Sequence, residues 1–173
     1  VLFGPLAGCL CGAIGQFIGF LMVPSGAWLG IFTFLIGTTT SLTSGLLSRG
    51  KWPGAVALSL LGMVLWFFTP VGMEAWFKAF TFGGSGLVMC ILSAIFAVKF
   101  LTRDNILLKM IAIFTCAAGG MFTAGQLADC VSQFLYRTPA ITYKIMAFIS
   151  PIERFIFAAA AAIVGIPLLL GLP

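Results

Sequence analysis

Residues 119–133 read GGMFTAGQLADCVSQ, an apolar and glycine-rich run that carries three regularly spaced polar side chains. Gln126, Asp129 and Gln133 stand three and four residues apart, so an α-helix places them on one face. A carboxylate at the centre of a membrane helix costs about 2.5–3.5 kcal/mol on insertion scales, so Asp129 needs a partner or water. We expect that partner in residues 150–154 (SPIER), where an acid and a base begin another apolar run. We predict that these two polar segments, residues 126–133 and 150–154, face each other as the polar mouths of their helices.

The composition is that of a membrane protein. Of 173 residues, 61% are hydrophobic and only 8% are charged, whereas roughly a quarter of residues are charged in soluble domains. Because a helix needs about 20 apolar residues to cross the bilayer core, the length accommodates about six crossings and little else. We therefore predict an all-α, polytopic membrane helix bundle that forms a single transmembrane domain over residues 1–173. The chain begins with Val1 rather than Met, which leaves open a segment before it.

Six apolar segments are predicted, at about residues 2–22, 28–48, 54–68, 80–98, 109–131, and from between 141 and 151 to 170. The loops after the second and fourth segments are basic, whereas Glu74 and Lys78 cancel in what reads as an interfacial turn. Basic loops stay on the cytoplasmic side, so both ends of the chain are expected there and the polar mouths at the outer face of the cell membrane.

Small residues form two stripes that predict close contact between helices. Glycines at positions 4, 8, 12, 15 and 19 lie on one face of the first segment, and alanines fill 158–162 of the last. We expect a subset of these residues to contact a partner subunit, namely Gly4, Gly8, Gly12, Ala158 and Ala162.

The polar cluster has two interpretations. In the first it lines a cavity that faces a ligand or a partner, formed by Gln126, Asp129, Gln133, Tyr136, Glu153 and Arg154. In the second, Asp129 and Glu153 are structural and pair with neighbouring bases. We favour the cavity, because a chain with only four acids places two of them, with two amides, at adjacent helix mouths.

Catalytic and metal-binding motifs are weak. Residues 83–86 (GGSG) resemble the serine motif of rhomboid intramembrane proteases, with Ser85 as the nucleophile, but rhomboids use a histidine base and this chain has no histidine. The five cysteines form no CxxC pair, and no phosphate-binding or dinucleotide-binding fingerprint is present. The nine basic residues are scattered singly, which argues against nucleic acid. We expect no enzyme activity, no metal and no cofactor.

Residues 3–15 (FGPLAGCLCGAIG) are similar to a stretch frequent in substrate-binding S components of energy-coupling factor (ECF) vitamin transporters. Residues 20–30, 127–129 and 151–154 followed by 158–167 also resemble parts of such proteins. The resemblance implies a six-helix bundle that binds a small molecule near its outer face. It also implies a coupling transmembrane subunit, contacted through a small-residue face, and a pair of ATPases as partners.

These patterns together predict a substrate-binding subunit of an ECF-type transporter that takes up a small polar or vitamin-like molecule. The alternative is a structural or accessory subunit of a larger membrane complex, which would dock through its glycine and alanine stripes.

Overall fold

The structure of the protein is a computed structural model that describes residues 4–27 and 29–171. The predicted starts of the first two segments, at residues 2 and 28, lie outside the described residues, as does Phe3 of the ECF-like stretch. The elements are, in order, α1 (Pro5–Met22), η1 (Pro24–Gly26), η2 (Gly30–Thr33), α2 (Phe34–Ser48), α3 (Trp52–Phe67), α4 (Trp76–Lys78), η3 (Ala79–Gly84), α5 (Ser85–Leu101), α6 (Ile106–Tyr136) and α7 (Ala140–Gly171). The predicted all-α fold is confirmed.

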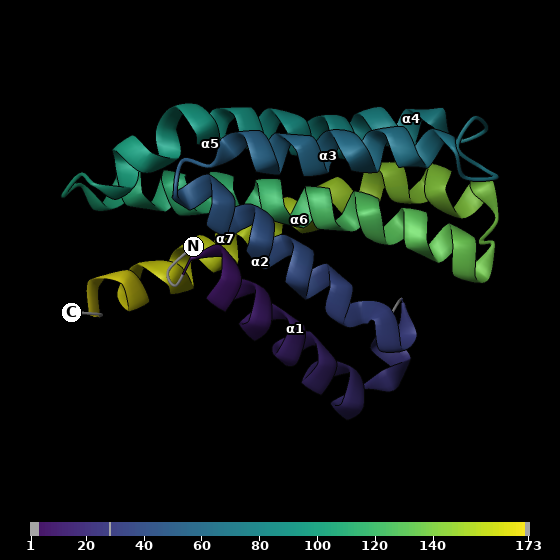
Figure 1. Cartoon of the computed structure of the whole chain (residues 1–173), viewed down its shortest axis with the longest axis horizontal. Helices are drawn as coiled ribbons and strands as arrows, with labels where there is room; N and C mark the ends of the chain where they lie inside the picture. Colours follow the sequence, from purple (N-terminus) through teal and green to yellow (C-terminus); the bar gives the residue numbers. More distant parts are fainter. Residues whose placement is uncertain (1–3, 28, 172–173) are drawn as a thin grey trace.

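Helices α3, α5, α6 and α7 run roughly along the long axis of the molecule, and the pair α1 and α2 is inclined to them (Figure 1). In the described part of the chain, five helical segments are long and apolar enough to cross a membrane, and α3 is a shorter apolar helix of 16 residues. The protein is therefore a multi-pass membrane protein. In Figure 1 the α2–α3 and α5–α6 loops lie at the same end as the start of α1 and the end of α7, and the other three connections lie opposite. The two strongly basic loops thus share one end, and their cytoplasmic orientation stays a prediction.

Helix α6 is the central element, and it packs against α2, α3, α5 and α7. It begins after Asn105, whose Oδ1 accepts hydrogen bonds from the backbone N–H groups of Leu107 (2.9 Å) and Leu108 (3.4 Å). It ends at Arg137, which adopts the left-handed conformation (φ 48°) two residues before Pro139. With 31 residues it extends beyond both predicted ends.

Small residues in the middle of α6 let its neighbours approach closely. A Cβ atom at Gly120 would lie 2.2 Å from Ser44 Oγ of α2, which instead donates a hydrogen bond to the Cys116 carbonyl at 2.9 Å. A Cβ atom at Gly119 would lie 3.2 Å from Cys90 Sγ of α5. The run at residues 119–133 is therefore the packed centre of the bundle, as its glycine content predicts.

The glycine stripe of α1 is used within the chain. Three predicted partner contacts pack against α2 or its C-terminal end: Gly4, Gly8 and Gly12. A Cβ atom at Gly12 would lie only 2.4 Å from the backbone oxygen of Gly37, so the two backbones are in direct contact. Gly15 and Gly19 differ, because no described atom lies within 4 Å of a Cβ at either position. Only this second half of the stripe is open.

The alanine stripe of α7 is also buried within the chain. Ala158 belongs to an apolar cluster with Phe82, Ala118 and Phe122, and Ala162 packs with Ile113 and Ile166. Both residues are accordingly unavailable as a surface for another subunit. The prediction of partner contacts through Gly4, Gly8, Gly12, Ala158 and Ala162 is corrected: periodicity shows which face is small, but their neighbours are helices of the same chain.

Candidate functional site

Arg154 lies halfway along α7, 14 residues after Ala140 and 17 before Gly171. At about 1.5 Å per residue it is more than about 20 Å from either end of the helix. Its Nε is buried without a hydrogen-bond partner, and within the described residues no carboxylate lies within 4 Å of it. An unpaired guanidinium at such depth is costly, so its surroundings are the natural place to look for a site.

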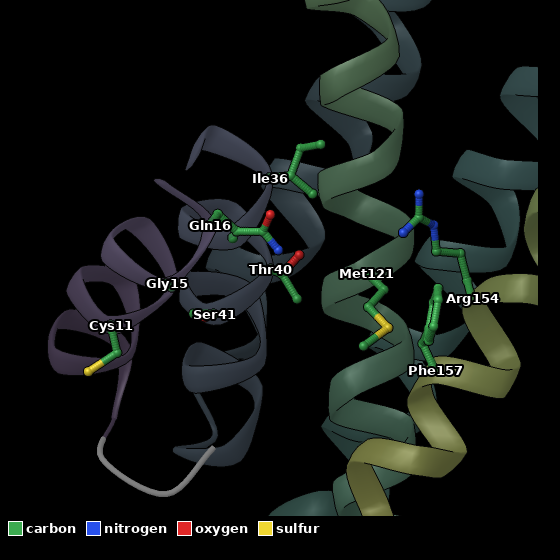
Figure 2. Close-up of a pocket in the computed structure, with 11 residues that line it drawn as sticks. Cys11, Gly15, Gln16, Ile36, Thr40, Ser41, Met121, Arg154 and Phe157 are labelled. Atoms are coloured by element: carbon green, nitrogen blue, oxygen red, sulfur yellow. The ribbon is translucent and has the colours of Figure 1, made fainter. Parts of the chain in front are cut away.

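Two adjoining cavities meet at Arg154, between α1 and α2 on one side and α6 and α7 on the other. The first, which we call the acid-lined cavity, has a volume of about 310 Å³ and includes Gln16, Thr33, Asp129, Ser150, Glu153 and Arg154 in its lining. The second, the glycine-lined cavity, has about 530 Å³ and includes Gly12, Gly15, Gly37, Thr40, Met121 and Phe157. Gln16, Ile36 and Arg154 line both. Figure 2 shows Gln16 and Thr40 across from Arg154, with Met121 of α6 between them.

Asp129 is paired with Lys78, and not with the acid–base segment at residues 150–154 as predicted. Lys78 is 1% exposed, and its Nζ lies 4.7 Å from the ring centroid of Trp66, 5.1 Å from that of Phe82 and 5.0 Å from that of Tyr143. We call these three rings the aromatic box. An ammonium group is attracted both to the carboxylate and to the ring faces. Lys78 is therefore buried within the bundle in helix α4, and its predicted interfacial level in the membrane stays a prediction.

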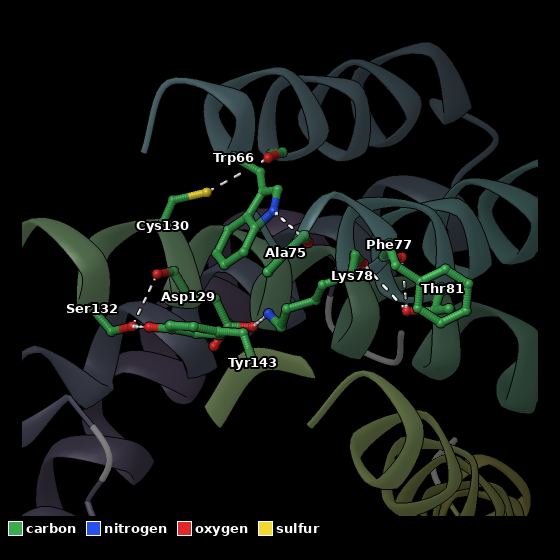
Figure 3. Close-up of polar contacts among 10 residues, drawn as sticks. Trp66, Ala75, Phe77, Lys78, Thr81, Asp129, Cys130, Ser132 and Tyr143 are labelled. Carbon is green, nitrogen blue, oxygen red and sulfur yellow. Dashed lines mark hydrogen bonds and ion pairs between the residues drawn. The ribbon is translucent and has the colours of Figure 1, made fainter. Parts of the chain in front are cut away.

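Hydrogen bonds hold the aromatic box in place (Figure 3). The Tyr143 hydroxyl lies 2.5 Å from Ser132 Oγ, and the Trp66 indole Nε1 donates to the Ala75 carbonyl at 3.2 Å. Trp66 and Tyr143 also meet edge to face, with ring centroids 5.0 Å apart. The box thus joins α3, η3 and α7 around one lysine.

The sequence contained a weak signal for Lys78. Glu74 lies four residues before it and invited the interpretation that the two charges cancel at the interface. Glu74 instead pairs with Lys144 at 3.0 Å, and both side chains are exposed. Two clues were available in the sequence. Aromatic residues surround Lys78 in the segment WFKAFTF, and the predicted topology places Lys78 at the same end of the bundle as Asp129.

The other predicted site residues do not line either cavity. Gln126 is fully buried against Gly62 and Gly83, and neither of its side-chain polar atoms has a hydrogen-bond partner in the described part of the chain. Gln133 donates through Nε2 to the Thr138 carbonyl at 2.6 Å. Tyr136 is exposed at the end of α6.

The structure therefore brings together three of the six predicted ligand residues, Asp129, Glu153 and Arg154. It adds Gln16, Thr33 and Ser150 to them. Of these, Gln16 had the clearest signal, because it is the one strongly polar side chain in the first apolar segment.

Features that would point to catalysis are few in the described residues. Ser85 Oγ donates to the Thr81 carbonyl at 2.5 Å, one helical turn earlier. Residues 4–27 and 29–171 hold no group of three or more cysteine or acidic side chains that is placed to bind a metal ion.

Comparisons with known proteins do not assign the chain to a family. No protein-family model matches the chain, and no solved structure matches it. One similar protein is an uncharacterized protein of Methanocaldococcus jannaschii, with 29% identity over 77 residues. The match covers 44% of this chain and 26% of that protein, so the chain spans about a quarter of its relative's length.

Proposed function

We propose that the chain is a membrane-embedded substrate-binding subunit that captures a small polar molecule in the cavities between α1–α2 and α6–α7. The observation that carries this proposal is Arg154, a guanidinium without an ion-pair partner, halfway along a membrane helix and in the lining of both cavities. Arg154 is only partly buried, but its Nε is buried without a hydrogen-bond partner. An anionic group on a ligand would satisfy the guanidinium with charge-assisted hydrogen bonds.

The rest of the lining suits a small ligand. Gln16, Thr33 and Ser150 offer neutral donors and acceptors, and Asp129 and Glu153 offer carboxylate acceptors. Ligand sites are typically cavities of about 300–1,000 Å³ with a small number of polar groups that fix orientation. At about 310 and 530 Å³ the two cavities fall within that range.

We assign this binding role to the S-component type because residues 3–15 resemble that family. A coupling membrane subunit and a pair of ATPases are then the expected partners, and a vitamin-like molecule the expected substrate. Such a subunit binds and releases its ligand without chemical change, so it requires no catalytic residue and no cofactor.

An accessory role in a larger membrane complex is the second candidate, and one observation favours it. Gly15 and Gly19 leave an open small-residue surface on α1, and Gly15 also lines the glycine-lined cavity. A helix of another subunit that packed there would be able to bring a carboxylate to Arg154.

Purification in mild detergent from native membranes separates the two candidates. Mass spectrometry is run on the co-purifying proteins and on the extracted small molecules, for the wild type, Arg154→Gln and the matched control Arg103→Gln, which lies in the exposed α5–α6 loop. A small molecule that accompanies the wild type and the control but not Arg154→Gln supports the binding role. A fixed set of membrane subunits without any small molecule contradicts it and favours the accessory role.

A further inference from the structure

The ionisable groups that line the acid-lined cavity are Asp129, Glu153 and Arg154. The charge of Asp129 is matched by Lys78, which is enclosed in the aromatic box and does not line the cavity. Glu153 and Arg154 are different, because neither makes an ion pair within the described residues. The cavity therefore presents one unmatched negative charge and one unmatched positive charge.

Glu153 and Arg154 are consecutive on α7, and this explains why they do not neutralise each other. Successive side chains on an α-helix point about 100° apart, so neighbours in sequence do not face each other. The helix thus holds a carboxylate and a guanidinium at the wall of one cavity but directs them to different parts of it.

From this arrangement, and on the premise of the proposed binding function, we infer that the ligand is a small zwitterion of amino-acid size. Its anionic group would lie at Arg154 and its ammonium group at Glu153. A ligand with only a negative charge would leave Glu153 unmatched, and one with only a positive charge would leave Arg154 unmatched. A neutral ligand would make a charge-assisted contact with neither the exposed Glu153 nor the partly buried Arg154.

The aromatic box limits where the ligand's ammonium group binds. Rings and a carboxylate together form a favourable ammonium site, but Lys78 already fills it. Asp129 therefore serves the cavity as a hydrogen-bond acceptor whose charge is already balanced. Glu153 is left as the acid that recognises a cation, with Gln16 and Ser150 as neutral groups in the same lining.

The test compares three matched classes of probe on the full chain in lipid nanodiscs. The probes are free amino acids (zwitterions), their N-acetyl derivatives (anions) and their α-amides (cations), and equilibrium binding is measured for each. We expect at least one amino acid to bind, and both of its derivatives to bind at least ~10-fold more weakly, because each lacks one charge-assisted contact.

Two variants and a control locate the charges. Glu153→Gln should remove the preference for the free amino acid over its N-acetyl derivative, and Arg154→Gln should weaken amino-acid binding at least ~10-fold. Glu74→Gln is the control, because Glu74 pairs with Lys144 outside the acid-lined cavity and should leave binding unchanged.

A wild-type chain that binds an N-acetyl derivative or an α-amide as tightly as the parent amino acid overturns the zwitterion inference, and this comparison requires no variant to fold. Failure of all three classes to bind also overturns it. The proposed function is judged separately, by whether any small molecule co-purifies with the wild type and is lost from Arg154→Gln.

Discussion

Lys78 and Asp129 lie on different helices and contact each other, whereas Glu153 and Arg154 are neighbours in sequence and contact no oppositely charged side chain in the described residues. Both arrangements place an acid and a base within membrane helices. In the first, the two charges compensate each other inside the bundle, and three aromatic rings enclose the lysine. In the second, both charges line a cavity. The closed pair holds helices together, and the open pair is available to a ligand.

The largest expected effect is on the closed pair. Lys78→Met leaves Asp129 as a buried carboxylate without its partner, which typically destabilises a protein by about 3–5 kcal/mol. We expect a large fall in the thermal unfolding temperature in detergent and loss of monodisperse protein on size-exclusion chromatography. A Lys78→Met protein as stable as the wild type would show that the pair does not hold the bundle together.

A double variant shows whether Lys78 and Asp129 stabilise the bundle as a pair. Lys78→Met combined with Asp129→Leu removes both charges and replaces them with apolar groups, a change that is often neutral or stabilising for a buried pair. We expect the double variant to recover most of the stability that Lys78→Met loses. If the two losses add instead, the two side chains act independently of each other.

The open pair should respond in the opposite way. Arg154→Gln removes a charge that has no ion-pair partner, so we expect unchanged or increased thermal stability for the protein without ligand. The same variant should lose stabilisation by added ligand, because binding to the folded state alone raises its stability. A destabilisation as large as that of Lys78→Met would contradict the distinction between the two pairs.

A smaller effect is expected from the support of the aromatic box. Tyr143→Phe keeps the ring beside Lys78 and removes the hydroxyl that lies 2.5 Å from Ser132 Oγ. The lost hydrogen bond should cost about 1 kcal/mol, visible as a small shift in the unfolding temperature. Tyr143→Leu, which also removes the ring, should cost more, and equal effects of the two variants would exclude a contribution from the ring.

The smallest effect is expected at the exposed pair. Glu74 and Lys144 are joined by a salt bridge of 3.0 Å, but both side chains are about half exposed. Exposed pairs contribute about 0–1 kcal/mol, so Glu74→Gln should leave the unfolding temperature nearly unchanged, with any effect reduced by added salt. A loss comparable to that of Lys78→Met would mean that burial is not what separates these pairs.

The central helix could be read from the sequence with good accuracy. The run at residues 119–133, which stood out for its glycines and its polar side chains, lies in α6, and α6 is the element that the other helices surround. Polar residues at offsets of three and four predicted one helical face, but periodicity does not identify the neighbouring helix. The partner of Asp129 therefore escaped prediction, since Lys78 ends α4 and is brought beside Asp129 where the adjoining η3 packs against α6.

The residues that line the acid-lined cavity were also only partly predictable from the sequence. Asp129, Glu153 and Arg154 were selected because charged residues are rare in this chain, and they do line one cavity. Gln16 belongs with them because of how α1 and α2 pair through Gly12 and Gly37, a contact between backbones that the separate segments do not specify. Gln126 and Gln133 were predicted to line the cavity as well, but both are buried away from it.

The binding role of Arg154 is tested most directly by a cryo-electron microscopy structure of the chain purified from native membranes together with the molecules that accompany it. We expect density for a small non-protein molecule within hydrogen-bonding distance of the Arg154 guanidinium, in the cavity lined by Gln16 and Asp129. A carboxylate from a partner helix bound to Arg154, with that helix filling the space beside Gly15, would contradict the binding function and establish an accessory subunit.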